Sequence, residues 1–164
     1  MRRAIATISD RTSIVLAVLG WLCLLLVVPL WPASFWYSLR TTVVTEDRTP
    51  DGHRIMQVDR TIHHDFLGDY RVEEQIKYHG GSYFTIQTCR GAGIRYRRDA
   101  SLPPVPTLDW WKGDSCRMVK PFTELPAGTY RICTWVTIRP SVLPPKEVSV
   151  CSNDFRRETA RIPS

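Results

Sequence analysis

The feature that most constrains this sequence is a charge-free run near its N-terminus. From Thr12 to Leu39 there is no Asp, Glu, Lys or Arg over 28 residues. The most apolar part, Ser13 to Leu30, would span about 27 Å as an α-helix, which is close to the thickness of a bilayer core. The run therefore predicts one transmembrane helix, with the membrane itself as a partner, and argues against a cytosolic globular protein.

This helix would divide the chain into four parts. We expect a cytoplasmic N-terminus at 1–12, a transmembrane helix with an aromatic interface at 13–36, an extracytoplasmic β-sandwich at 37–155 and a flexible tail at 156–164. A cleaved signal peptide is an alternative, but the small-residue cleavage pattern is missing. A buried core helix is the other alternative, although a helix that is apolar on every face does not suit so small a domain.

The cysteines decide the predicted orientation. Three arginines precede the apolar run and three follow it closely, so the positive-inside rule gives nearly a tie. Four of the five cysteines lie in the C-terminal part, which fits an oxidising compartment, whereas Cys23 lies inside the apolar run. We therefore predict a single-pass inner-membrane protein with its N-terminus in the cytoplasm and its C-terminal domain in the periplasm.

After residue 40 the chain shows the two-residue period of β-strands. Apolar side chains alternate with polar ones in four stretches, at 56–62, 70–78, 130–138 and 148–150. Gly and Pro separate these stretches, and no helical period of useful length intervenes. The predicted fold class is all-β: an antiparallel, immunoglobulin-like β-sandwich preceded by one N-terminal transmembrane helix.

Two cysteines are predicted to pair across a hairpin. If 129–139 and 145–151 form its arms around the turn at 140–144, Cys133 lies directly opposite Cys151. Opposed residues of an antiparallel pair are close enough for a disulfide. By elimination Cys89 would pair with Cys116, with free thiols as the alternative. A zinc site is disfavoured because no C-x-x-C pair occurs.

No catalytic motif is present. His63, His64 and Asp65 include two adjacent histidines that a strand would point to opposite faces, so we expect no metal site. Glu73 and Glu74 diverge for the same reason. Nucleophile, phosphate-loop and dinucleotide signatures are missing, so no cofactor and no enzymatic activity are expected.

Two stretches are candidate binding surfaces. The first is basic, and its arginines with the interleaved Tyr96 are suited to a polyanion; they are Arg90, Arg95, Arg97 and Arg98. The alternative is a hairpin whose outer arginines are balanced by acids such as Asp99. The second stretch is the pair Trp110 and Trp111, of which one is expected in the core and the other at a partner contact. Nucleic acid is an unlikely partner, because the residues after 39 carry a net charge of only +4.

Four strings carry a family resemblance: Phe66–Val72, Leu108–Trp111, Leu125–Arg131 and Val150–Asn153. In this order they resemble small membrane-anchored proteins encoded by tailed bacteriophages and prophages. The run from Leu125 to Tyr130 also looks like the approach to a late strand of immunoglobulin-like sandwiches. The Tyr–Cys spacing differs there by one residue, so the resemblance does not imply the inter-sheet disulfide of antibody domains.

These observations predict a membrane-anchored, non-catalytic periplasmic interaction module. With the resemblance to phage proteins, its expected role is at the host envelope, in lysis modulation or superinfection exclusion, with an envelope protein as partner. One alternative is a domain that binds a polyanion such as nucleic acid, a lipid head group or lipopolysaccharide. The other is a secreted or periplasmic enzyme. The sequence indicates no oligomeric state.

Overall fold

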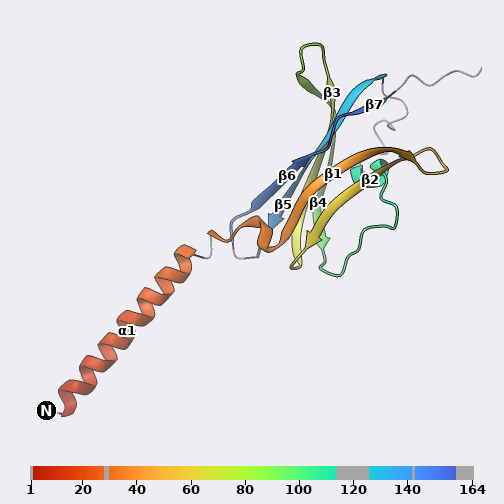
Figure 1. The fold of residues 1–164 in the computed structure, drawn as a ribbon. Helices are drawn as coiled ribbons and strands as arrows, with labels where there is room; N and C mark the ends of the chain where they lie inside the picture. Colours follow the sequence, from red (N-terminus) through yellow and green to blue (C-terminus); the bar gives the residue numbers. More distant parts are fainter. Residues whose placement is uncertain (1, 28–29, 114–125, 142, 158–164) are drawn as a thin grey trace, which may run out of the picture.

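The protein combines one N-terminal helix with a domain of antiparallel strands (Figure 1). The structure is a computed structural model that describes residues 2–27, 30–113, 126–141 and 143–157. Its elements are α1 (Arg2–Val27), η2 (Ala33–Phe35), β1 (Tyr37–Arg48), β2 (Arg54–Ile62), β3 (Phe66–Lys77), β4 (Tyr83–Tyr96), α2 (Leu108–Lys112), β5 (Gly128–Arg139), β6 (Lys146–Cys151) and β7 (Phe155–Arg157).

The predicted transmembrane helix is wrong. No helix in the described part of the chain has the length and apolar character needed to cross a membrane. The charge-free part of α1 runs only from Thr12 to Val27, about 24 Å, whereas a bilayer core is about 30 Å thick. The rest of the charge-free run belongs elsewhere, because Trp36, Tyr37 and Leu39 are buried in the core of the β-domain.

The predicted membrane location is wrong for the same reason. The single-pass inner-membrane topology, with a cytoplasmic segment at 1–12 and a periplasmic domain, depended on a spanning segment at 13–36. Most of the predicted cytoplasmic segment at 1–12 is helical, because α1 begins at Arg2. The aromatic residues assigned to a membrane interface instead contact one another and His64, with the Phe35 and His64 rings stacked at 4.3 Å.

The strands form two unequal antiparallel sheets. β1 and β2 make a two-stranded sheet, and the second sheet has the order β4-β3-β5-β6, with β7 also pairing with β5. The antiparallel all-β prediction for this domain is therefore confirmed. The immunoglobulin-like topology is not found: that fold divides seven strands into four and three, whereas the described strands divide into two and five.

The two faces of the larger sheet follow the period-2 pattern of the sequence. On β5 the even-numbered residues from Tyr130 to Ile138 are buried and face β1 and β2. On β3 the inward residues are likewise even-numbered, and they include Val72 and Glu74. The apolar core lies between the sheets in two clusters, and the half-buried Trp111 and Val58 pack against both.

A single asparagine ties β1 to the larger sheet. The Asn153 side chain accepts a hydrogen bond from the Val44 N–H at 2.8 Å and donates one to the Val44 carbonyl at 3.1 Å. An amide side chain can make both bonds because it carries a donor and an acceptor, as a peptide group does. The smaller sheet is thus held by polar contacts as well as by the core.

A β-bulge interrupts β4 at 91–93. The register slips between the pairs Tyr70–Gly91 and Gly68–Ile94, and Gly93 adopts a positive φ of 67°. The Gly93 N–H donates to Asp69 Oδ1 at 2.9 Å. After this bulge Ile94 and Tyr96 point inward, so the even positions of β4 now share the inner face with β3.

The C-terminal boundary also differs from the prediction. Arg156 and Arg157 belong to β7, which pairs with the start of β5, so they are not part of a tail. The remainder of the predicted tail, 158–164, lies outside the described residues.

Candidate functional site

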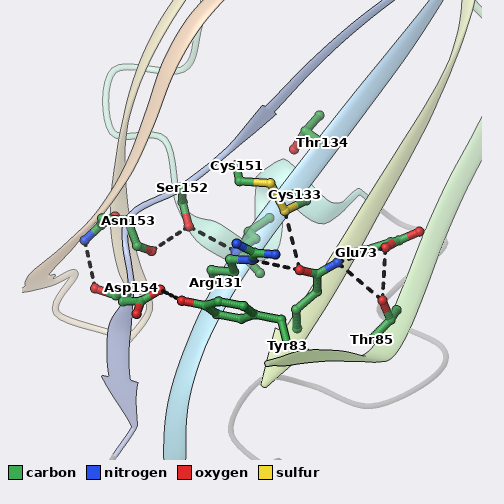
Figure 2. Close-up of a disulfide and its surroundings, with 12 residues drawn as sticks. Glu73, Tyr83, Thr85, Arg131, Cys133, Thr134, Cys151, Ser152, Asn153 and Asp154 are labelled. Atoms are coloured by element: carbon green, nitrogen blue, oxygen red, sulfur yellow. Dashed lines mark hydrogen bonds between the residues drawn. A yellow bond between two sulfur atoms is a disulfide. The ribbon is translucent and has the colours of Figure 1, made fainter. Parts of the chain in front are cut away.

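The predicted hairpin disulfide is present. β5 and β6 pair in the expected register, and Cys133 and Cys151 are joined with their Cα atoms 4.0 Å apart (Figure 2). Cys89 is also disulfide-bonded, whereas its predicted partner Cys116 lies outside the described residues. Cys23 is a free, exposed thiol.

The outer face around the disulfide is interlocked by polar contacts. Arg131 Nε donates to Gln75 Oε1 at 2.8 Å, and its guanidinium lies 3.5 Å from the Tyr83 ring centroid. Gln75 in turn donates to Glu73 and Thr85. Figure 2 shows Arg131, Tyr83, Glu73 and Thr85 around Cys133. Because the donors and acceptors satisfy one another, this arrangement stabilises the sheet.

A buried ion pair lies on the opposite face of the same sheet. Lys112 Nζ of α2 donates to Glu74 Oε1 of β3 at 2.8 Å, and the two side chains are 3% and 0% exposed. Desolvation raises the pKa of Glu74 although Lys112 lowers it.

An aromatic pocket of about 230 Å³ opens between the two sheets. Its walls come from both sheets and from α2, and the aromatic residues that form them are Tyr37, Tyr70, Tyr96, Trp110 and Trp111. Contacts between neighbouring side chains hold several of these aromatic rings in place. The Tyr37 and Tyr96 rings meet edge to face at 5.8 Å, and Trp111 Nε1 donates to Thr134 Oγ1 at 2.9 Å.

The two tryptophans divide as the sequence predicted. Trp111 packs against the apolar core, while Trp110 is 40% exposed at the edge of the pocket. Their ring centroids are 6.1 Å apart. The short helix α2 produces this arrangement, since Thr107 caps it by accepting from the Trp110 N–H at 3.2 Å. A partner contact at Trp110 stays a prediction.

The pocket contains one charged side chain among the described residues that line it. Arg60 of β2 is half-buried there, and it makes no hydrogen bond or ion pair with the described part of the chain. Its positive charge acts on two neighbouring phenols and lowers their pKa values, but burial has the larger effect. Burial raises the pKa of Tyr37 well above its usual value and that of Tyr96 to about 12.

The predicted basic surface is only partly assembled. Arg95, Arg97 and Arg98 line one open hollow of about 810 Å³ together with Asp65 and Asp99. Arg90 lies apart from them, in a hollow that Arg71 and Trp135 also line. Asp99, which the sequence suggested as a balancing charge, lies in this hollow, and so does Asp65, whose Oδ1 accepts from the Arg98 N–H.

The histidines are dispersed. His53 Nδ1 lies 2.7 Å from Asp109 Oδ2, His63 Nε2 lies 3.0 Å from Ser38 Oγ, and His64 stacks on Phe35. Within the described ranges, no group of three or more His, Cys, Asp or Glu side chains is arranged to hold a metal ion.

Sequence reasoning missed the most enclosed part of the site. The pocket wall and its charge come from Tyr37, Arg60 and Tyr96, which lie on three different strands. One signal was available: Arg60 is in phase with Met56, Val58 and Ile62 on β2, so a charged residue occupies an apolar face. A charge at such a position is either paired or functional.

Comparisons with known proteins give no relative. No protein-family model, no curated protein and no solved structure matches this chain.

Proposed function

We propose that this protein is a non-catalytic interaction module that binds a partner protein at the edge of the aromatic pocket. The observation that carries the proposal is Trp110, a tryptophan 40% exposed beside a pocket with packed aromatic walls. Tryptophan side chains that project next to preformed pockets are enriched among the residues that dominate binding energy. The proposed partner is an envelope protein, in line with the resemblance to phage-encoded proteins.

A matched pair of variants tests this proposal. Trp110→Ala removes the exposed ring at the pocket, whereas Phe84→Ala removes an aromatic ring that is 56% exposed on β4 and does not line the pocket. We expect capture of a candidate partner by the immobilised protein to fall about tenfold or more with Trp110→Ala, and to stay unchanged with Phe84→Ala. Equal loss in both variants, or in neither, contradicts the proposal.

The structure favours polyanion binding as a second candidate function. The guanidinium groups of Arg95, Arg97 and Arg98 face one hollow, and no hydrogen bond or ion pair joins them to other described residues. Free guanidinium groups bind phosphate and sulfate groups bidentately. Two carboxylates in the same hollow reduce the net charge, which is why we place this function second.

Retention on a heparin column separates the two candidates. Changing Arg95, Arg97 and Arg98 to Gln together lowers the salt concentration at which the protein elutes, if these residues bind polyanions. The control changes three other exposed arginines, Arg40, Arg48 and Arg156, and removes the same charge. If both variants elute alike, retention reports net charge only and the second function is wrong.

A further inference from the structure

The aromatic pocket contains a charge that the fold does not use. Arg60 is half-buried between aromatic rings, yet none of the described residues supplies it with a carboxylate or a carbonyl oxygen. Arg54, at the start of the same inward-facing row of β2, shows the contrast: its guanidinium donates to the Thr45 and Arg156 carbonyls and pairs with Glu46. Both arginines are turned inward, but of the two only Arg54 has hydrogen-bond and ion-pair partners among the described residues.

The rest of the pocket favours an anion with an apolar body. No acidic side chain is among the described residues that line it, and the nearest carboxylate that acts on its wall is that of Asp69, which raises the pKa of Tyr96 less than burial does. The pKa values of Tyr37 and Tyr96 are raised by burial, so both phenols stay protonated at neutral pH. Protonated phenols donate hydrogen bonds to an oxyanion, while the surrounding rings contact apolar atoms.

We propose that this pocket binds a carboxylate that is attached to a small aromatic or apolar group, with the carboxylate on Arg60 and the apolar group between Trp110 and Tyr37. The volume of about 230 Å³ is below the usual range for drug-sized ligands, so the apolar group is no larger than one or two rings. Guanidinium binds carboxylate in a planar, bidentate manner, which gives preference for an acid over its amide.

Two sources offer this chemistry. One is a free small aromatic acid. The other is the C-terminal residue of a polypeptide, whose α-carboxylate lies next to an apolar side chain. For the polypeptide source the inference rests on the proposed function, because the C-terminal residue would then belong to the partner protein bound at Trp110. For the free acid it is independent of that proposal.

Ligand titrations of the full chain test the inference. The Trp111 indole N–H lies in the pocket and is held by Thr134, so its nitrogen-15 NMR signal reports occupancy. Phenylacetate is the probe for the free acid, and phenylacetamide is its neutral control. A short peptide ending in Phe is the probe for the second source, with the C-terminal amide of the same peptide as control. We expect at least one acid to bind about tenfold or more tightly than its amide.

Arg60→Gln should abolish this preference for the acid and leave the weak binding of the amide unchanged. The matched control is Arg40→Gln, which removes an arginine from the exposed side of β1 and should retain the preference. If Arg60→Gln does not fold, as judged by its thermal unfolding, Ile94→Trp replaces it. Ile94 is a 40% exposed residue of the pocket wall, and a larger side chain there should fill the pocket and block both probes.

The outcomes separate this inference from the proposed function. Equal affinity for acids and amides, loss of preference in Arg40→Gln, or no change of the Trp111 signal with either probe overturns the carboxylate site. If Trp110→Ala nevertheless reduces the capture of a protein partner, the proposed function stands without the carboxylate site. Binding of phenylacetate with no effect of Trp110→Ala on protein capture supports the site and contradicts the proposed function.

Discussion

The two faces of the larger sheet use their polar residues in opposite ways. On the outer face, Arg131, Gln75 and Glu73 satisfy one another next to the disulfide. On the inner face, Glu74 and Lys112 form a buried pair that Asp109 approaches at 3.5 Å, and Arg60 faces a pocket with no hydrogen-bond or ion-pair partner among the described residues. A polar network on an exposed sheet face is ordinary, whereas an unsatisfied inward charge is costly and calls for a ligand.

This difference separates structural residues from candidate binding residues. Loss of one outer contact leaves groups that water can solvate, so its cost is small. Loss of one inner partner leaves a charge without water, so its cost is large. The four predictions below test this ranking of the two faces, beginning with the change expected to cost most.

The buried pair should give the largest effect. Glu74→Leu removes the nearest and most buried carboxylate from the Lys112 ammonium and leaves Asp109 at 3.5 Å, which should lower the free energy of unfolding by about 3–5 kcal/mol. Adding Lys112→Met removes the buried ammonium and should restore most of the loss. Urea unfolding of the single and double variants measures both values. A double variant less stable than Glu74→Leu would show that the pair itself is not the stabilising unit.

Removal of the outer disulfide should give the second-largest loss of stability. Replacing Cys133 and Cys151 together by Ala opens a cross-link between residues 18 positions apart and should lower the free energy of unfolding by about 2–4 kcal/mol. The outer face is then held by its polar network and the strand register. The measurement is the unfolding midpoint in urea of this variant against that of the oxidised wild-type protein. An unchanged midpoint would contradict a stabilising role for this bridge.

The sequence predicted the features that depend on neighbouring residues in one hairpin. The Cys133–Cys151 register follows from the length of a turn and the two-residue period, both of which are local. The division of Trp110 from Trp111 is local too, because successive residues of a helix are rotated by about 100°, so one ring packs on the core while the other reaches solvent. The same period placed Glu73 and Glu74 on opposite faces, as the structure shows.

Features that need distant segments were not predictable in this way. The charge-free run was interpreted as one segment, but the structure divides it between α1 and the core, where Trp36 and Tyr37 pack. The aromatic pocket joins residues from five strands and α2, so no spacing in the sequence reveals it. Glu74 and Arg60 were nevertheless visible as charges in phase with apolar neighbours, which is the signal to look for.

A single methyl group added at Gly91 should displace the Tyr70 ring. A Cβ atom on Gly91 would lie 2.2 Å from Tyr70 Cε1, so Gly91→Ala must displace the ring that lines the pocket. We expect a loss of about 1–3 kcal/mol in unfolding free energy and a shift of the Trp111 indole signal. Gly93→Asn is the control, because nothing lies within 4 Å of its added Cβ and Asn tolerates a positive φ. Similar changes in both variants would contradict the steric explanation.

The smallest effect is expected at Asp154 on the outer face. Hydrogen bonds from Lys77 and Tyr83 lower the pKa of this carboxyl below its ordinary value of 3.8. Its ionised form therefore stabilises the fold at pH values above 3.8, and this contribution is lost as the pH falls through the lower pKa of the folded state. Because the ion pair is more than one-third exposed, Asp154→Asn should cost about 0.5 kcal/mol or less at neutral pH.

The pH dependence gives that variant a distinct signature. Asp154→Asn should be less stable than the wild type at pH 7 and equally stable once the wild-type carboxyl is protonated, so the two curves of unfolding free energy converge in acid. Asp47→Asn removes an equal charge from an exposed position on β1 and should leave the curve of the wild type unchanged. A loss at Asp154 as large as that at Glu74 would mean that the outer face is as dependent on its charges as the inner one, and the contrast between the two faces would fail.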